Sequence, residues 1–336
     1  MNEDLMERPE QCKNSKGGTE LIQERIYNRL PRELLEKFQI WFSRYNPEKV
    51  NRDKIQILYV HDWVGDPMYD HLKNDGWKKF NRILFVSNVQ MLHFMGVYSI
   101  PWSFCLVMQN FIDPIEPDKS IEGTMDPKQI NIGYWAVPRK GLQIVVPVYE
   151  KLIEKYDNIL LHVTSSFGLY GWAEQDEQYA NIIDKCKNHP NISYSEAINN
   201  ETMRACIATY DILAYPSIFP ETSCLCLMEA MSAGCICVHP NYAALFETAA
   251  GWTNMYQWHE DQSKHAGIFY NAMCATIDSL DNDEVKNRLI AQKTYADTFY
   301  TWSKREAEWL ALLSVLSKNR ANLIVKNDKE YFSYMP

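Results

Sequence analysis

Short apolar runs alternate with stretches of helical periodicity along most of the chain. Runs of strand length occupy residues 38–42, 55–60, 82–87, 104–108, 129–134, 158–163, 192–194, 212–215 and 235–238. Between them, apolar positions recur every three to four residues, as in residues 21–26, 143–156 and 200–210. Such alternation is typical of α/β folds with parallel sheets. The pattern therefore predicts two Rossmann-like domains.

A segment dense in proline and aspartate, residues 113–127, separates two blocks of alternating elements. We expect an N-terminal domain over residues 1–118, a C-terminal domain over residues 119–305, and a final helix and tail over residues 306–336. The opening segment has little apolar periodicity. The N-terminal domain is therefore either reduced or begins its sheet at a later strand, such as residues 38–42.

The stretch YPSIFPETSCLCLMEAMSAG, residues 215–234, joins a predicted strand to a predicted helix. Thr222 and Ser223 are suitable N-caps for this helix. The backbone N–H groups around and after them, on Cys224 and Leu225, have no partner within a helix. The sequence therefore predicts a pocket for an anion at the start of the helix.

Two carboxylates flank this predicted pocket. Glu221 precedes the helix, and Glu229 lies eight residues further along the chain. At the rise of an α-helix, the two carboxylates are at most roughly 12 Å apart along the axis. A ligand with hydroxyls at both ends and a diphosphate in the middle, such as a nucleotide sugar, would fit between them. The alternative interpretation is that Glu221 is a solvated loop acid and Glu229 lies on the exposed face of an amphipathic helix.

The same stretch resembles the motif of two glutamates separated by seven residues in retaining GT-B glycosyltransferases of family 4. The residues that match in order are Pro216, Ser217, Glu221, Glu229, Ala230, Met231, Ala233 and Gly234. The resemblance covers most of residues 16–318. It implies two Rossmann-like domains facing each other across a cleft, with an acceptor domain first, a nucleotide-sugar domain second, and a terminal helix packed back on the first domain.

Two further segments match this family. Gly17 and Gly18 precede a predicted helix and permit close approach of the backbone to a ligand, although a glycine pair also forms ordinary loops. The resemblance places them near the donor phosphates and the acceptor. His61 follows the predicted strand at residues 55–60, where a histidine is often structural. The resemblance places it beside the donor sugar.

Arg139 and Lys140 precede the helix predicted over residues 143–156. Cations at this position, near an acidic loop, suit a bound diphosphate, and solvated surface charge is the alternative. The resemblance implies that Lys140 holds the diphosphate together with an arginine several residues upstream. That position is Tyr134 or Trp135 in this chain, and we expect Arg139 to replace the arginine.

The resemblance assigns the following roles. The residues expected to act in catalysis are Glu221, His61 and Lys140. The residues expected to bind substrate are Glu229, Arg139, Gly17, Gly18, Thr222, Ser223, Cys224 and Leu225. Glu221 would bind hydroxyls of the donor sugar, Glu229 would bind the ribose, and the amides after Glu221 would contact the diphosphate.

Four closely spaced cysteines, Cys224, Cys226, Cys235 and Cys237, invite comparison with a zinc site. Structural zinc sites usually take pairs of ligands two to four residues apart in loops. Here the first pair falls at the predicted helix start, and the second lies in a predicted strand with both side chains on one face. The pattern favours thiols of the hydrophobic core, and we expect no metal.

Composition narrows the class of protein. The chain has 336 residues and a net charge of −9, so nucleic acid is not expected as a partner. No apolar run approaches 18 residues and the N-terminus is acidic, which predicts neither a membrane span nor a secretory signal, while peripheral contact with a membrane stays open. Nine cysteines without a disulfide pattern favour a reducing compartment, so we expect a cytoplasmic protein. The oligomeric state is left open.

We predict a glycosyltransferase, specifically a hexosyltransferase. It would move a sugar from a UDP- or GDP-linked donor to the hydroxyl of a glycan or other acceptor, with retention of anomeric configuration and without a metal or cofactor. The alternatives are a GT-B nucleotide-sugar epimerase or hydrolase, and a non-catalytic carbohydrate-binding protein that keeps the fold. A dehydrogenase is disfavoured because no Gly-x-Gly-x-x-Gly follows a strand.

Overall fold

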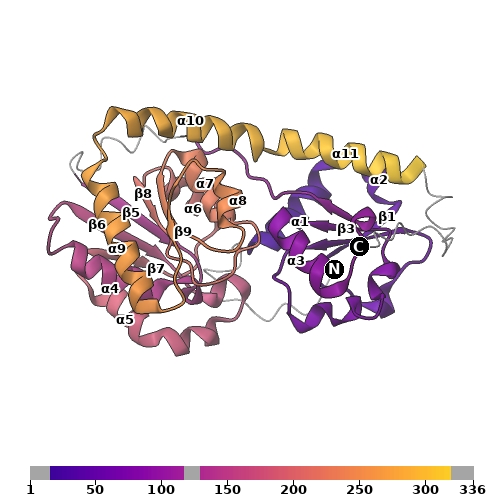
Figure 1. Ribbon diagram of the computed structural model, residues 1–336, viewed down its shortest axis with the longest axis horizontal. Helices are drawn as coiled ribbons and strands as arrows, with labels where there is room; N and C mark the ends of the chain where they lie inside the picture. Colours follow the sequence, from indigo (N-terminus) through magenta and orange to yellow (C-terminus); the bar gives the residue numbers. More distant parts are fainter. Residues whose placement is uncertain (1–15, 117–128, 319–336) are drawn as a thin grey trace, which may run out of the picture. The chain divides into compact units, whose positions relative to one another are not determined.

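The computed structural model describes residues 16–116 and 129–318, which form two compact units (Figure 1). The six-stranded unit contains the described residues up to Ile22 and those from Asn110 to Trp302. The four-stranded unit contains Gln23–Gln109 and the described residues from Ser303 onwards. The predicted glycine loop therefore belongs to the six-stranded unit. The opening segment and residues 319–336 of the predicted tail lie outside the described residues.

A parallel sheet with the order β1-β2-β3-β4 organises the four-stranded unit. Its strands are β1 (Phe38–Phe42), β2 (Ile55–Val60), β3 (Arg82–Phe85) and β4 (Cys105–Val107). Every residue of β2 is buried, because this strand has a neighbour on each side and both sheet faces are covered. The strands predicted at residues 38–42 and 55–60 are confirmed at both ends.

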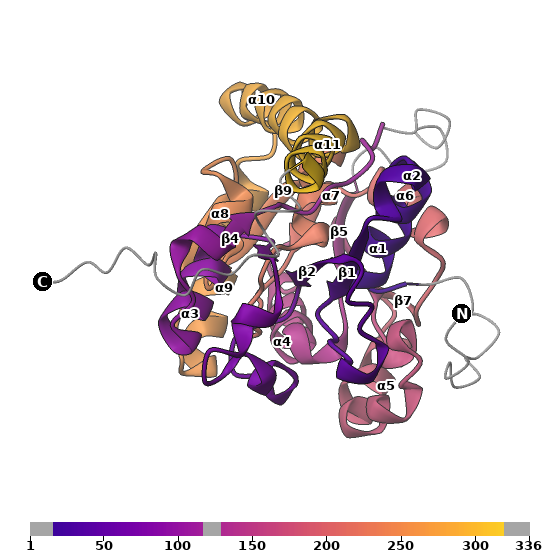
Figure 2. The same cartoon turned by 90° about the vertical axis from the view of Figure 1, so that its right-hand side faces the viewer.

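Helices and short turns cover this sheet. They are α1 (Gly18–Arg29), α2 (Arg32–Leu35), α3 (Asn88–Tyr98) and α11 (Trp302–Lys318), with 3-10 turns η2 (Pro47–Lys49), η3 (Pro67–Leu72), η4 (Gly76–Lys79) and η5 (Trp102–Phe104). Figure 2 shows α3 beside β4 and α1 beside β1. Helix α1 begins in the six-stranded unit and continues into the four-stranded unit.

The six-stranded unit has a parallel sheet with the order β10-β9-β8-β5-β6-β7. Its strands are β5 (Ile130–Trp135), β6 (Ile159–Thr164), β7 (Ile192–Ser195), β8 (Ile212–Ala214), β9 (Ile236–Asn241) and β10 (Asn254–Gln257). The order reverses direction between β5 and β8, which are neighbours in space. In open α/β sheets, ligands bind at the carboxyl ends of strands at such a reversal.

The helices of this unit form two groups. They are α4 (Leu142–Leu152), α5 (Ala180–Asn188), α6 (Asn200–Ile207), α7 (Leu225–Ala233), α8 (Leu245–Ala249), α9 (Gln262–Asp278) and α10 (Asp283–Phe299), with 3-10 turns η6 (Pro138–Lys140), η7 (Phe167–Tyr170) and η8 (Ala173–Tyr179). Helix α4 packs against α5 and α9, whereas α7 packs against α6, α8 and α10. Right-handed crossovers place these groups on opposite faces of the sheet (Figure 1).

The C-terminal helical region consists of two helices, and the second begins before residue 306, where the sequence predicts the final segment to start. Helix α10 ends at Phe299 and α11 begins at Trp302. At the break, the N–H of Ile112 donates to the carbonyl oxygen of Tyr300 at 2.7 Å, and Ile112 pairs with Thr301 in an isolated parallel bridge. Backbone groups that bond to this distant segment cannot also continue a helix, which explains the interruption.

Candidate functional site

The loop between β8 and α7 carries the first predicted acid. Helix α7 begins at Leu225, and its N-cap is Cys224, which makes no side-chain capping hydrogen bond. The prediction that Thr222 or Ser223 caps the helix was therefore wrong. One reason that the helix begins later than predicted lies far along the chain. The carbonyl oxygen of Ser223 accepts a hydrogen bond from the side-chain amide of the buried Asn110 at 3.4 Å. The first N–H groups of α7 consequently receive no capping side chain from Cys224.

Glu221 is buried, with only 5% of its surface exposed. Its Oε1 lies 2.8 Å from Nζ of Lys140 and accepts a hydrogen bond from the hydroxyl of Tyr215 at 2.5 Å. Its backbone carbonyl accepts from the N–H of Ala244 at 3.0 Å. The interpretation of Glu221 as a solvated loop acid was wrong. Carboxylates are almost never buried without a charged partner, and Lys140 is that partner here.

Lys140 ends the turn η6, and the residue after it fixes its position. Gly141 has a φ of 127°, and a Cβ atom on it would lie 2.5 Å from the carbonyl oxygen of Pro216. Only glycine allows this close approach between the β5 and β8 loops. Burial lowers the pKa of the Lys140 ammonium, but the charge of Glu221 and neighbouring tyrosine and cysteine groups outweighs burial and raises the pKa overall. Lys140 is therefore a cation throughout the physiological pH range.

Arg139 is exposed, unlike its neighbour in sequence. Its guanidinium lies over the ring of Phe219 at 4.6 Å and over the ring of Phe167 at 5.8 Å. The ammonium of Lys140 lies over the same Phe219 ring at 5.3 Å. The two cations thus flank one aromatic side chain of the β8–α7 loop, and the guanidinium keeps its hydrogen-bonding edge for another group.

The predicted glycine loop lies against the same region of the six-stranded unit. A Cβ on Gly17 would lie 2.5 Å from Cε1 of Tyr170, and a Cβ on Gly18 would lie 3.2 Å from Leu225 at the start of α7. Lys16 fastens the loop, because its N–H donates to Asn200 Oδ1 at 3.1 Å and its carbonyl accepts from Asn200 at 3.4 Å. The loop therefore sits beside the first turn of α7 without space for larger residues.

Glu229 lies on α7 with 14% of its side chain exposed, so the interpretation of an exposed helix face was wrong. Arg204 of α6 approaches Glu229 Oε1 at 3.4 Å. The same guanidinium donates through Nη2 to the backbone carbonyls of Asp113 and Pro114, both at 2.8 Å. Arg204, which the sequence analysis did not single out, thus joins the second acid to the backbone at Asp113 and Pro114.

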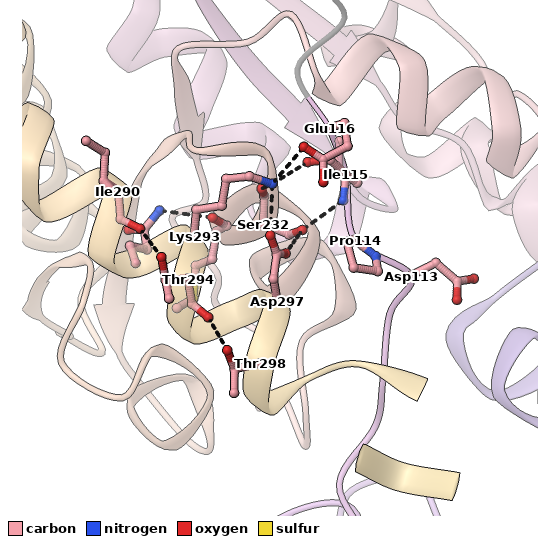
Figure 3. A network of polar contacts seen from close by, with 12 residues as sticks. Asp113, Pro114, Ile115, Glu116, Ser232, Ile290, Lys293, Thr294, Asp297 and Thr298 are labelled. Carbon is pink, nitrogen blue, oxygen red and sulfur yellow. Dashed lines mark hydrogen bonds and ion pairs between the residues drawn. The ribbon is translucent and has the colours of Figure 1, made fainter. Parts of the chain in front are cut away.

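A second polar network holds the other end of α7 (Figure 3). Lys293 of α10 donates to the carbonyl oxygens of Ile115 and Ser232, both at 2.8 Å, and pairs with Asp297 at 2.9 Å. Ser232 donates to Asp297 at 2.5 Å and accepts from the N–H of Ile115 at 2.9 Å. Together with Arg204, this network fixes the segment at residues 113–116 to α7.

His61 follows β2 in the four-stranded unit, as predicted, and 8% of its surface is exposed. Its ring contacts those of Tyr59 and Phe42, with centroids 4.3 and 6.0 Å away. The backbone N–H of His61 donates to the hydroxyl of Ser43 at 3.0 Å. Burial lowers the pKa of His61 to about 3. The imidazole is consequently neutral at physiological pH.

The four closely spaced cysteines belong largely to the core. Cys224, Cys235 and Cys237 are buried in the hydrophobic cluster of the six-stranded unit, and Cys226 packs against it. Within residues 16–116 and 129–318, no group of His, Cys, Asp and Glu side chains is arranged to hold a metal ion. In the part of the chain that the structure describes, no helix has the length and apolar character needed to cross a membrane.

The structure thus brings together Gly17, Gly18, Lys140, Glu221 and Leu225 at the carboxyl ends of β5 and β8. Arg139 joins them through the ring of Phe219, whereas Glu229 is engaged with Arg204 and His61 belongs to the other unit. Tyr170, which the sequence analysis did not identify, also faces this group.

Residues 119–256 match the family model described as glycosyl transferases group 1. This chain carries a glycosyltransferase domain. The matched segment lies within the six-stranded unit, which contains the Lys140–Glu221 pair and Glu229 of α7. The search of curated protein sequences found no match for the chain.

Solved structures resemble the fold of this chain. Alr3699/HepE of Anabaena, solved with UDP, has a TM-score of 0.62 and 16% identity over 78% of this chain and 73% of its own. A glycosyltransferase from Rickettsia africae ESF-5 has a TM-score of 0.61 and 14% identity over 90% and 81%. Sucrose-phosphate synthase from Thermosynechococcus elongatus has a TM-score of 0.62 and 11% identity, over 81% of this chain and 69% of its own. The predicted fold class, GT-B with Rossmann-like domains, is confirmed.

Proposed function

We propose that this chain transfers a sugar from a nucleotide-sugar donor to the hydroxyl of an acceptor, with retention of anomeric configuration and without a metal ion, as in GT-B enzymes of family 4. The observation that carries the proposal is the ion pair between half-buried Lys140 and buried Glu221, 2.8 Å long, beside the N-terminus of α7 in a glycosyltransferase domain. A half-buried cation next to the first N–H groups of a helix suits an anionic ligand, and the adjacent carboxylate suits hydroxyl groups.

The roles follow from the chemistry of each group. The donor diphosphate would lie against Lys140, the Arg139 guanidinium and the amides from Thr222 through Cys224 to Leu225. Glu221 accepts hydrogen bonds and would bind hydroxyls of the donor sugar. Glu229 would bind the ribose, and His61 would lie by the donor sugar.

Transfer breaks the bond between C1 of the sugar and an oxygen of the diphosphate, and the electron pair stays on that oxygen. The acceptor hydroxyl forms the new bond to C1 from the same face, and its proton passes to the departing phosphate oxygen. Negative charge therefore grows on the diphosphate in the transition state. Lys140 and the α7 amides are fixed donors that stabilise this charge without reorganising, which is the largest effect that many enzymes use.

Solved relatives support this choice of substrate. Alr3699/HepE has been solved with UDP and with UDP-glucose. A structure of trehalose-6-phosphate synthase, with a TM-score of 0.61 and 12% identity, concerns enzymatic glycosyl transfer with retention. UDP-glucose is accordingly the first donor to test. We assign the donor to the six-stranded unit and the acceptor to the four-stranded unit, whose divisions at residues 22, 110 and 302 differ from the predicted domain boundaries at residues 118 and 305.

The test begins with binding. Thermal unfolding is followed with UDP-, GDP- and ADP-linked sugars, because a ligand that binds the native state raises its stability with concentration. The donor that binds is then incubated with hydroxyl acceptors, with and without EDTA, and NMR of the product reports its anomeric configuration. We expect transfer with retention that EDTA does not diminish.

Other outcomes identify the alternatives. Release of free sugar or of an epimer without any acceptor would indicate a hydrolase or epimerase. Binding without turnover of any donor would indicate a carbohydrate-binding protein. An inverted product, or loss of transfer in EDTA, would overturn the proposed stereochemistry or the proposed independence of metal.

A further inference from the structure

Tyr170 stands at the carboxyl end of β6, where η7 ends and Gly171 turns the chain with a φ of 78°. It comes from a different loop than Lys140 or Glu221. Its side chain nevertheless lies close enough to both charged groups to interact with them electrostatically. None of the roles described above includes this phenol.

The loop that presents Tyr170 is firmly held. Ser166 caps η7 by accepting from the N–H of Gly168 at 2.8 Å, and its hydroxyl donates to Asp176 at 2.5 Å. The other oxygen of Asp176 accepts from the N–H of Phe167 at 2.8 Å. Because these bonds fix the turn on both sides, the Tyr170 ring is oriented before any ligand arrives.

The ring also has a defined neighbour. A Cβ on Gly17 would lie 2.5 Å from Cε1 and 3.0 Å from Cδ1 of Tyr170. Such separations do not occur between real side chains, so Gly17 is needed for the ring to pack on the backbone of the glycine loop. The phenol therefore packs on this loop, within range of electrostatic interaction with Lys140 and Glu221.

The hydroxyl is a neutral donor in this setting. Burial raises the pKa of Tyr170, with Lys140 and Arg139 lowering it and Glu221 and Glu20 raising it, and the net shift is upward. The O–H therefore stays protonated at physiological pH. Among the described residues, no side chain or backbone group forms a hydrogen bond with this hydroxyl, so a ligand can receive it.

We propose that the hydroxyl of Tyr170 donates a hydrogen bond to the diphosphate of the nucleotide sugar, a catalytic role that rests on the function proposed above. The acceptor is an anion because the groups that interact electrostatically with Tyr170 include Lys140 and Arg139, the two cations that suit a phosphate. In the proposed function, the carboxylate of Glu221 binds the sugar hydroxyls, so they are not the partner assigned to Tyr170. A neutral donor adds stabilisation as charge grows on the leaving group, and no proton is transferred.

The experiment compares Tyr170→Phe with the wild type. This change removes the hydroxyl and keeps the ring that packs on Gly17. Dissociation constants are measured for UDP and UMP, for GDP and GMP, and for ADP and AMP, by calorimetry. For the pair that binds the wild type, we expect the preference for the diphosphate over the monophosphate to fall about tenfold in Tyr170→Phe, because a hydrogen bond to a charged group is lost.

Turnover gives the second measurement. We expect kcat to fall at least about tenfold in Tyr170→Phe, since the donor acts on charge that develops in the transition state. Tyr270→Phe is the matched control, because Tyr270 is a tyrosine of α9 whose ring contacts Lys151 rather than the site. It should keep both the wild-type preference and the wild-type kcat.

The outcomes separate the two proposals. If the wild type binds none of the nucleoside diphosphates, the proposed function fails and the role of Tyr170 with it. If the wild type binds one and transfers sugar while Tyr170→Phe keeps the wild-type preference for diphosphate, the role of Tyr170 alone is overturned. A thermal midpoint for Tyr170→Phe close to that of the wild type confirms that the variant is folded.

Discussion

Two carboxylates bracket the start of α7, and each has a cation beside it. Glu221 is the more buried, with 7% of its side chain exposed, and lies 2.8 Å from Lys140. Glu229 has 14% exposed and lies 3.4 Å from Arg204. An ammonium has three donors and Lys140 uses one on Glu221, so it can still engage a ligand. Arg204 instead directs Nη2 at two backbone carbonyls.

The difference shows that similar ion pairs serve different purposes. The Lys140–Glu221 pair joins the loops after two neighbouring strands, β5 and β8, at the edge of the sheet where ligands bind. The Arg204–Glu229 pair joins two helices and the segment at residues 113–116. We therefore expect substitutions in the first pair to reduce activity and loss of the Arg204 side chain in the second to reduce stability.

The largest effect should come from Glu221→Gln. The amide keeps the size of the side chain but removes the charge that pairs with Lys140 and would bind the donor sugar. We expect kcat/KM to fall by a factor of about 10² to 10³, as for other groups that act on the transition state. Initial rates of nucleoside diphosphate release measure this, with Glu284→Gln, an exposed glutamate of α10, as the control. A loss of less than tenfold would contradict the role of Glu221.

Arg204→Ala should act mainly on stability. It leaves Glu229 without its cation and removes the donors to the carbonyls of Asp113 and Pro114. We expect the free energy of unfolding to fall by about 2 kcal/mol, because three charged hydrogen bonds of a half-buried side chain are lost together. Urea unfolding provides the measurement, while kcat of the folded variant should change little.

A matched control tests whether the loss of stability in Arg204→Ala depends on the burial and the partners of this side chain. Arg32 pairs with Glu36 on the surface at 3.2 Å, and its side chain is 92% exposed. Exposed pairs of this kind contribute little, so Arg32→Ala should cost less than about 0.5 kcal/mol. If the two arginine variants unfold at the same urea concentration, the anchoring role assigned to Arg204 is incorrect.

Glu229→Gln sharpens the comparison with a smaller effect. The amide oxygen can still accept from Arg204, so stability should be nearly unchanged, and only the charge available to the ribose is lost. We expect KM for the nucleotide sugar to rise about tenfold with little change in kcat, the signature of lost ground-state binding. Steady-state kinetics at varied donor concentration decide this. A fall in kcat instead would move Glu229 into the reaction itself.

The sequence predicted the sheets better than the helix boundaries. Strands β1 and β2 were predicted to the residue, because their apolar runs end at charged or turn residues. The start of α7 was misplaced because Ser223 has a better capping side chain than Cys224, yet its carbonyl is engaged by Asn110, which lies 113 residues away. The break between α10 and α11 depends in the same way on the pairing of Ile112 with Thr301.

The site was predictable where strand order alone decides it. Lys140 and Glu221 each follow a strand, and the carboxyl ends of parallel neighbours meet, so the pair could be expected once both strands were known. Tyr170 could not be found in this way, since its place depends on the capped turn η7 and on the lack of a side chain at Gly17. Arg204 escaped notice because two of its three partners are backbone carbonyls, which carry no sequence signal.

The smallest effect on activity is expected from His61, whose ring packs against Tyr59 and Phe42, whereas Glu221 and Glu229 each lie in an ion pair. Its pKa is about 3 in the folded state against an ordinary value of 6.5, so the unfolded chain binds more protons between these values. Stability should therefore rise with pH across this window and be lost as pH falls below 6.5. In His61→Gln this acid-side slope should be shallower, as measured by urea unfolding from pH 4 to 7.

Activity should show no such dependence on His61. A neutral imidazole with so low a pKa does not titrate between pH 5 and 8, so it can orient a ligand but does not exchange a proton at these pH values. The pH profile of kcat/KM in this range should keep its shape in His61→Gln, as it should in His93→Gln, an exposed histidine of α3. A limb near pH 6.5 that His61→Gln abolishes and His93→Gln keeps would show that the ring is charged during the reaction. Burial alone would then not determine the protonation state of the His61 imidazole.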